Sequence, residues 1–137
     1  MAMMKYQEPE FIEIELDRLL EAVGQVADEG LAFVQICATT KEASCELLYT
    51  FQDTTYETKG LKGLLVDVPD GAHVPSITGI YPAAFVFENE THDLFGVQID
   101  GINIDFGGEF YTVAVAYPMN PRAAQSDETA EEEADNE

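Results

Sequence analysis

The sequence predicts an α+β domain of two layers, in which two helices cover one face of a mainly antiparallel or mixed five-stranded sheet. Three observations support this prediction: an amphipathic stretch near the N-terminus, three consecutive strand-like segments, and a second helical stretch followed by two more strand-like segments. The expected order of elements is αβββαββ. A chain of 137 residues with 46% hydrophobic residues is long enough to bury one core.

The first helix is predicted from apolar residues at the i, i+3, i+4, i+7 spacing of one helix face, namely Leu16, Leu19, Leu20, Val23, Val26 and Ala27. We expect it to span residues 14–29, so residues 1–13 form an N-terminal extension. Acidic side chains at the start of this stretch suit the positive end of a helix dipole. Gly30 is placed to take the left-handed conformation that ends a helix.

Three strands are expected next, over residues 31–39, 44–52 and 58–68. The short polar connections between them favour antiparallel hairpins. Pro82 suits the first turn of a helix and Gly96 suits its end, so a second helix is expected over residues 82–95. Two further strands are expected over residues 97–104 and 109–117.

The composition changes after Pro118 to proline, alanine, serine and acidic residues, so residues 119–137 are expected to form a disordered acidic tail and residues 14–118 the domain. With 27 acidic and 6 basic residues, the chain has a formal net charge of −21. Nucleic acid and anionic membrane surfaces are therefore poor partners. No apolar run reaches the roughly 20 residues of a membrane span, and no secretion signal is visible, so a cytoplasmic protein without direct membrane insertion is expected.

The residue types that usually hold metals or nucleotides are too sparse to form a site. Cys37 and Cys45 are eight positions apart without a CxxC pair, so they indicate buried thiols and no zinc or iron–sulfur ligation. His73 has no companion at ligand spacing and is expected on the surface. The glycines at 101, 107 and 108 match no phosphate-binding pattern. The chain is expected to bind no cofactor.

The second helix has two different faces. One gathers the residues expected to pack on the sheet: Ala83, Ala84, Phe87, Thr91, Leu94 and Phe95. Phe85 lies opposite them, among Asn89 and His92, and Val86 flanks Asp93. Apolar residues on a polar face indicate a contact surface for another chain, the alternative being that a long loop covers them.

The carboxylates of this helix do not converge. Glu88 and His92 are four residues apart, while Glu90 and Asp93 are three apart on another flank. Acid–base catalysis and metal binding both need groups that face one site, so solvated or paired carboxylates are the expected state.

Residues 74–97, VPSITGIYPAAFVFENETHDLFGV, resemble the signature segment of the complex I 30 kDa subunit family, whose members are the C-type subunits of NADH dehydrogenase. The matching positions are Val74, Pro75, Ser76, Thr78, Tyr81, Pro82, Ala84, Phe87, Glu88, Glu90, Asp93, Leu94, Phe95 and Gly96. The resemblance covers roughly residues 14–104. Asn89 replaces an arginine of the family pattern, Val86 a frequent tryptophan, and Ile102 a basic residue. The usual basic ending is also missing, which resembles the short subunits of energy-converting nickel–iron hydrogenases and formate hydrogenlyase-type complexes.

The resemblance implies a non-catalytic, cofactor-free structural subunit that docks on the large, hydrogenase-like (49 kDa-like) subunit and beside the small iron–sulfur subunit. Iron–sulfur clusters and a nickel–iron centre or quinone would belong to those partners, at the inner face of the cell membrane. The implied interface is Phe85, Val86, Glu88, Asn89, Glu90, His92 and Asp93. The implied structural residues are Pro75, Ser76, Pro82, Ala84, Phe87, Leu94, Phe95 and Gly96. The alternatives are a 30 kDa-type subunit of an NADH:quinone oxidoreductase and a free-standing acidic protein-binding module.

Overall fold

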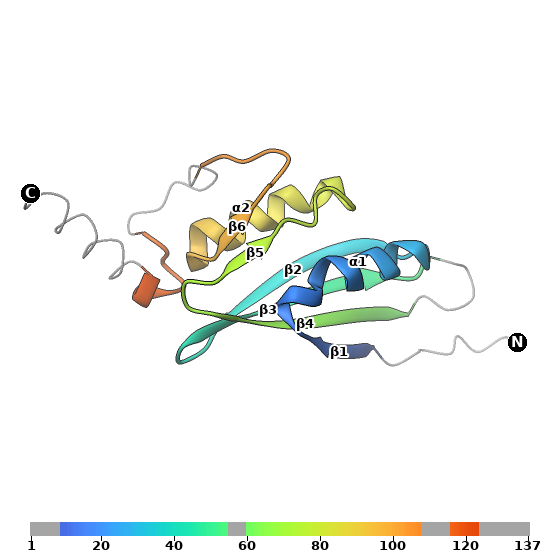
Figure 1. Cartoon of the computed structure of the whole chain (residues 1–137), viewed down its shortest axis with the longest axis horizontal. Coiled ribbons are helices and arrows are strands. Elements are labelled where there is room, and N and C mark those ends of the chain that lie inside the picture. The colour runs from blue at the N-terminus through green and yellow to red at the C-terminus, as the bar shows by residue number, and fades with distance from the viewer. Residues whose placement is uncertain (1–8, 55–59, 108–115, 124–137) are drawn as a thin grey trace, which may run out of the picture.

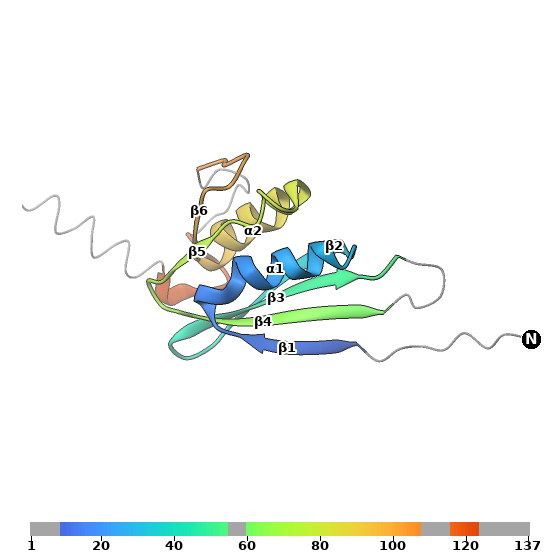
Figure 2. The same ribbon diagram turned by 45° about the vertical axis from the view of Figure 1, so that its right-hand side comes forward.

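The computed structural model describes residues 9–54, 60–107 and 116–123, and its architecture has the two layers expected from the sequence. One layer is a four-stranded sheet in the order β1-β4-β3-β2, formed by Glu10–Ile14, Leu61–Pro69, Ser44–Gln52 and Ala32–Thr40. Helices α1 (Leu19–Asp28) and α2 (Phe85–Phe95) lie over one face of this sheet (Figure 1). The opposite face carries no helix of the described chain (Figure 2).

The central hairpins confirm the predicted antiparallel arrangement. Strand β3 pairs with β2 on one side and with β4 on the other, both antiparallel. In β3, Cys45, Leu47, Tyr49 and Phe51 are buried and alternate with residues that face away from the helices. Because side chains alternate along a strand, this pattern directs one face of the sheet into the core.

The core lies between the sheet and the two helices. Fully buried side chains from α1 meet those of β3 and β4, and Ala84 contributes from just before α2. The main contributors are Leu19, Val23, Val26, Leu47, Tyr49, Phe51, Leu64, Val66 and Val68. Burial of this apolar surface is the main source of stability and fixes where α2 lies.

The N-terminal region differs from the prediction of an extension followed by a helix from residue 14. Residues Glu10–Ile14 form β1, which pairs with β4 in parallel and makes the sheet mixed. A 3₁₀ turn, Leu16–Arg18, follows, and α1 begins only at Leu19. Local periodicity could not show β1, because its pairing partner lies about fifty residues further along the chain.

The predicted end of the first helix is confirmed. Gly30 has φ +81°. Its N–H donates to the carbonyl of Ala27, and the N–H of Leu31 donates to that of Val26. These two bonds form the Schellman motif, which satisfies the carbonyls at the end of a helix.

A second, two-stranded sheet replaces the rest of the predicted five-stranded sheet. Strand β5 (His73–Pro75) pairs in parallel with β6 (Gln98–Asp100), and α2 connects them. The strand expected over 97–104 is therefore shorter than predicted. Most of the strand expected over 109–117 lies outside the described residues, and residues 116 and 117 are not in a strand.

Residues 119–123, which the composition assigned to the tail, pack against the domain. Asn120 is buried, and the N–H of Met119 donates to the carbonyl of Leu94 over 2.8 Å. Arg122 forms an ion pair with Asp70. The domain therefore extends at least to residue 123. Residues 124–137 lie outside the described part of the chain, and their disorder stays a prediction.

The two cysteines differ, because Cys45 is buried as expected whereas Cys37 is exposed. Cys37 lies on β2 opposite Leu48, on the face of the sheet that the helices do not cover. Among the described residues, no helix is both long enough and apolar enough to cross a membrane.

Candidate partner interface on helix α2

The two ends of helix α2 lie where the sequence predicted them, after Pro82 and before Gly96. Pro82 begins a 3₁₀ turn, Pro82–Ala84, that leads directly into α2. Gly96 ends the helix with φ +71°, and its N–H donates to the carbonyl of His92. A Cβ atom at position 96 would come within 2.5 Å of the Cβ of Ala123, so only glycine fits between the helix and the C-terminal segment.

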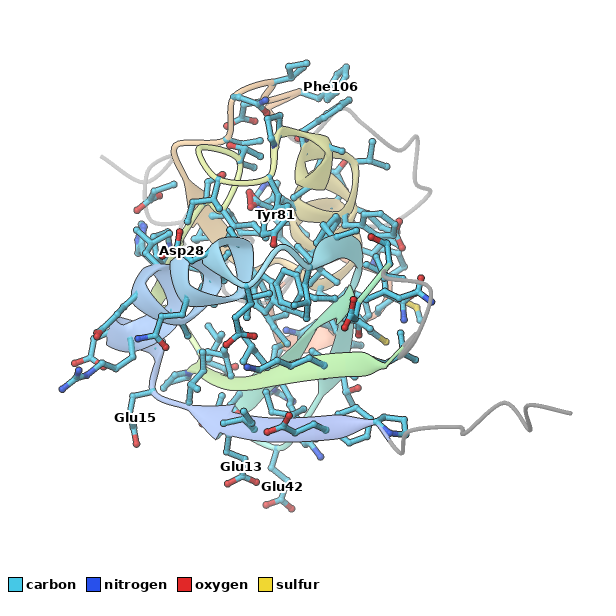
Figure 3. All side chains as sticks on the ribbon, turned by 90° about the vertical axis from the view of Figure 1, so that its right-hand side faces the viewer. Glu13, Glu15, Asp28, Glu42, Tyr81 and Phe106 are labelled. Carbon is cyan, nitrogen blue, oxygen red and sulfur yellow. The ribbon has the colours of Figure 1, made fainter. Side chains whose placement is uncertain are left out.

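The inward face of α2 packs on β2 and β3 through aromatic rings. Phe87 meets Phe33 edge-on at 5.6 Å between ring centroids, and Phe33 also contacts Phe51 and Tyr81. The Tyr81 hydroxyl donates to the carbonyl of Leu31 over 2.7 Å, and burial raises the pKa of this phenol. Tyr81 thereby ties the entrance of α2 to the segment that joins α1 to β2, and in Figure 3 it lies between these two parts of the chain.

Glu88 points into the domain and not toward solvent. Its side chain is 1% exposed, and its Oε1 accepts the N–H of Ile77 over 2.7 Å and the Ser76 hydroxyl over 3.2 Å. Burial raises the pKa of this carboxyl, while the hydrogen bonds from Ile77 and Ser76 lower it. Burial, together with the charge of Glu88, also raises the pKa of the neighbouring phenol of Tyr49.

The loop that Glu88 holds is itself cross-linked. The hydroxyls of Ser76 and Thr78 lie 2.6 Å apart, and Thr78 Oγ1 accepts the N–H of Asn103 over 3.0 Å. One buried carboxylate thus organises the Val-Pro-Ser-x-Thr opening of the signature and, through Thr78, the segment after β6. A hydrogen bond from a buried donor to a charged acceptor contributes more than a neutral one.

Asn89, at the position where the family pattern has arginine, is also buried and is bonded at both ends of its amide. Its Nδ2 donates to the carbonyls of Phe85 and Ile104, each over 2.8 Å. Its Oδ1 accepts the N–H of Phe106 over 3.1 Å. The amide therefore fixes residues 104–106 against α2.

Phe85 and Val86 are half-buried, and a loop covers one of them. The ring of Phe106 stacks on that of Phe85, with centroids 6.5 Å apart. The exposed apolar side chains of this region are consequently Ile104 and Phe106, at 48% and 42% exposure. We refer to Phe85, Val86, Ile104 and Phe106 together as the α2 patch. In the sequence, the outer part of this patch is indicated only by two apolar residues, Ile104 and Phe106, among polar neighbours.

The remaining residues of the predicted interface lie toward the C-terminal end of α2. His92 is half-buried, its Nδ1 lies 3.0 Å from the carbonyl oxygen of Val97, and its ring meets Tyr117 edge-on. Asp93 is buried and Glu90 is half-buried. The structure thus brings Glu88, Asn89 and Asp93 inside the domain and leaves Val86 and Glu90 nearer the surface.

Most residues of the face of α2 that was expected to pack on the sheet are at least partly buried, with two differences. Ala84, Phe87 and Phe95 belong to the core or pack against it, as expected. Thr91 is buried, and its hydroxyl donates to the carbonyl of Phe87 over 2.7 Å. Ala83 is exposed, and Leu94 is half-buried outside the core, because the inward stripe runs through Ala84, Glu88 and Thr91.

The structure adds residues that sequence reasoning assigned to the tail. Asn120 donates to the carbonyl of Phe95 over 2.9 Å, next to the bond from Met119 to Leu94. These two bonds satisfy carbonyls that the last turn of α2 leaves open. The sequence could not predict that Asn120 is buried, because a single asparagine among prolines and alanines forms no periodic pattern.

The chain is similar in sequence to subunits of respiratory enzymes. The family model described as "Respiratory-chain NADH dehydrogenase, 30 Kd subunit" matches residues 12–104. The C subunit of the NADH-quinone oxidoreductase of Saccharopolyspora erythraea is 29% identical over 96 residues, which is 64% of this chain and 38% of that protein. The corresponding protein of Mycolicibacterium gilvum is 30% identical over 99 residues, covering 66% of this chain and 43% of that protein. The chain thus spans about two fifths of the length of these relatives.

A solved structure has the same fold. A chain of the membrane-bound sulfane sulfur reductase, an archaeal respiratory membrane complex, superposes with a TM-score of 0.69 at 22% identity. The match covers 85% of this chain and 71% of that chain. Most of the described domain is therefore a shared architecture.

Proposed function

Because the chain belongs to the 30 kDa subunit family of the respiratory-chain NADH dehydrogenase, we propose that it is a non-catalytic structural subunit of a membrane-associated oxidoreductase complex. Its role is to dock on the large subunit of that complex through the α2 patch and the neighbouring surface of α2. The protein would lie at the inner face of the membrane, held there by its partners.

This proposal rests on the hydrogen bonds that the buried polar side chains of α2 make. Glu88 and Asn89 are the most buried polar side chains of the signature. Glu88 is hydrogen-bonded to the loop 76–78, and Asn89 is hydrogen-bonded to residues 104–106. At 1% exposure each, these two side chains are not presented to a substrate at the surface. They hold two loops and the α2 patch in one arrangement, which is what a docking surface needs to avoid an ordering cost on binding.

Within this class, we favour an energy-converting hydrogenase or formate hydrogenlyase-type complex. Asn89 replaces the arginine of the respiratory pattern. Its side chain, which is shorter than that of arginine, hydrogen-bonds α2 to residues 104–106. Iron–sulfur clusters and a nickel–iron centre would belong to the partner subunits. Among the described residues, no group of three or more His, Cys, Asp or Glu side chains is arranged to hold a metal ion.

A second candidate is a subunit of an NADH:quinone oxidoreductase. The sequence relatives, which are NADH-quinone oxidoreductase C subunits of 29% to 39% identity, favour it.

Purification of the tagged chain from its native host, followed by mass spectrometry, separates the two candidates. Co-purification of a nickel–iron large subunit and a small iron–sulfur subunit supports the first, and a flavin-binding NADH subunit supports the second. Recovery of the chain alone under mild detergent conditions would support a free-standing acidic binding module and contradict both.

A further inference from the structure

A wide groove lies at the end of β1, away from the α2 patch. Its volume is about 1130 Å³, and its walls come from the β1–α1 connection, the end of β4 and the segment leading into β5. In Figure 3, Glu13 and Glu15 project at the opposite side of the molecule from Phe106. Roughly 300–1,000 Å³ is usual for small-molecule pockets, so this open groove is large for such a ligand.

The groove exists because β1 is shorter than the strand beside it. Strand β1 ends at Ile14, opposite Val66, while β4 continues to Pro69. Among the described residues, no strand therefore lies beside Asp67–Pro69 on that edge. The 3₁₀ turn Leu16–Arg18 contacts β4 and covers part of this edge, and the part without a strand partner can accommodate an extended peptide.

The walls of the groove combine carboxylates with apolar side chains. The carboxylates are Glu13, Glu15, Asp17, Glu46 and Asp67, and the aliphatic side chains are Ile14, Leu16, Leu20 and Leu65. Within the described residues, no Lys or Arg lines the groove, and its one histidine, His73, pairs with Asp100. Leu20 is 44% exposed and adds an accessible apolar side chain to the wall of the groove.

We propose that this groove binds an extended, basic segment of a neighbouring protein chain in which apolar residues alternate with Lys or Arg. Its basic side chains meet the carboxylates on the rim, and its apolar side chains cover Leu16 and Leu20. Charge complementarity identifies the partner: five carboxylates, with no Lys or Arg beside them among the described lining residues, favour a positively charged segment. This surface is separate from the α2 patch, so the proposal does not depend on the proposed docking of the large subunit.

The probe is a short synthetic peptide in which leucine and lysine alternate, added to the full-length, isotopically labelled chain. NMR amide shifts are expected at residues 13–20, 46 and 65–75. The double variant Glu13→Gln/Glu46→Gln should bind about fivefold more weakly, because two surface ion pairs are lost. The matched control, Asp28→Asn/Asp105→Asn, removes the same charge outside the groove and should change the affinity by less than about twofold.

A second peptide, with serine in place of leucine, tests the apolar part of the groove and should bind more weakly at the same charge. Equal weakening by both double variants would show attraction to the acidic chain as a whole and overturn the proposal. Shifts confined to the acidic residues 127–137 would overturn it too. Melting curves of both variants, unchanged within a few degrees, exclude loss of folding as the cause.

Discussion

The carboxylate of Glu88 accepts the backbone N–H of Ile77 over 2.7 Å, so the signature helix is bonded to the loop that precedes it in the signature. Ser76 donates to the same oxygen. The two halves of the family signature are therefore one hydrogen-bonded unit in this chain. The remaining carboxylate oxygen of Glu88 is buried and has no hydrogen-bond partner among the described residues.

Glu88 should give the domain a distinct pH dependence. Burial is the largest influence on this carboxyl and raises its pKa above the ordinary value of 4.5. Between the unfolded-state and folded-state pKa values, the folded protein holds a proton that the unfolded chain has released. The stability contributed by protonated Glu88 is therefore fully present below the unfolded-state pKa and is lost as the pH rises through the folded-state pKa.

Denaturant unfolding of the wild type and of Glu88→Gln across this pH range measures the effect. The free energy of unfolding of the wild type relative to Glu88→Gln should fall as the pH rises. Glu42→Gln, a change at an exposed carboxylate on the β2–β3 turn, controls for the loss of one charge. A relative stability that rises with pH would show that the hydrogen bonds to Glu88 outweigh its burial.

Asn89→Ala should release residues 104–106 from α2. The change removes three hydrogen bonds and leaves two loop backbone groups, the carbonyl of Ile104 and the N–H of Phe106, without their partner. We expect a loss of about 1–3 kcal/mol in the free energy of unfolding. Hydrogen exchange should become faster at residues 104–106 before it changes in the sheet. Gln98→Ala, at an exposed position, is the control, and equal exchange in both variants would contradict this role.

Gly96→Ala and Gly24→Ala should have opposite effects. At position 96 a Cβ meets Ala123 and φ is +71°, so we expect a loss of about 1–3 kcal/mol and displacement of residues 117–123. At position 24, inside α1, no atom beyond the neighbouring residues and the backbone of the helix itself lies within 4 Å of the added Cβ, so a gain of roughly 0.5–1 kcal/mol is expected. Thermal melting of the two variants measures this contrast. A neutral Gly96→Ala would show that the C-terminal segment does not pack against the end of α2.

Truncation at two positions should locate the end of the domain. Removing residues 124–137 deletes charged, polar sequence and should leave the melting temperature almost unchanged. Removing residues 119–137 also deletes the bonds of Met119 and Asn120 to α2 and should cost about 1–3 kcal/mol. Asn120→Ala in the full chain should show part of this loss. Equal melting temperatures for both truncations would mean that the domain ends at Pro118.

The sequence predicted those parts of the fold whose signals are local. The hairpins of β2, β3 and β4 follow from alternation and short connections, and the limits of α2 follow from Pro82 and Gly96. Strand β1 was missed because its parallel partner is distant in sequence. The packing of Asn120 was missed because a single buried amide has no periodicity.

The burial of residues along α2 was predicted in part, for a similar reason. Helical periodicity separated the two faces of α2 correctly for Phe87 and Phe95. It could not show that Glu88 and Asn89 point into the domain, because polarity usually indicates exposure. Their burial depends on backbone groups of two loops whose positions only the tertiary fold defines.

Co-purification of patch variants tests most directly whether the α2 patch docks on the large subunit of an oxidoreductase complex. The double variant Ile104→Ser/Phe106→Ser removes the exposed part of the patch, while Leu61→Ser changes another exposed apolar residue, at the start of β4. Each tagged, full-length chain is expressed in the native host beside a melting curve of the purified protein. We expect the double variant to melt within a few degrees of wild type yet recover much less large subunit, and Leu61→Ser to recover the wild-type amount. Full recovery of the large subunit by the folded double variant would contradict this docking.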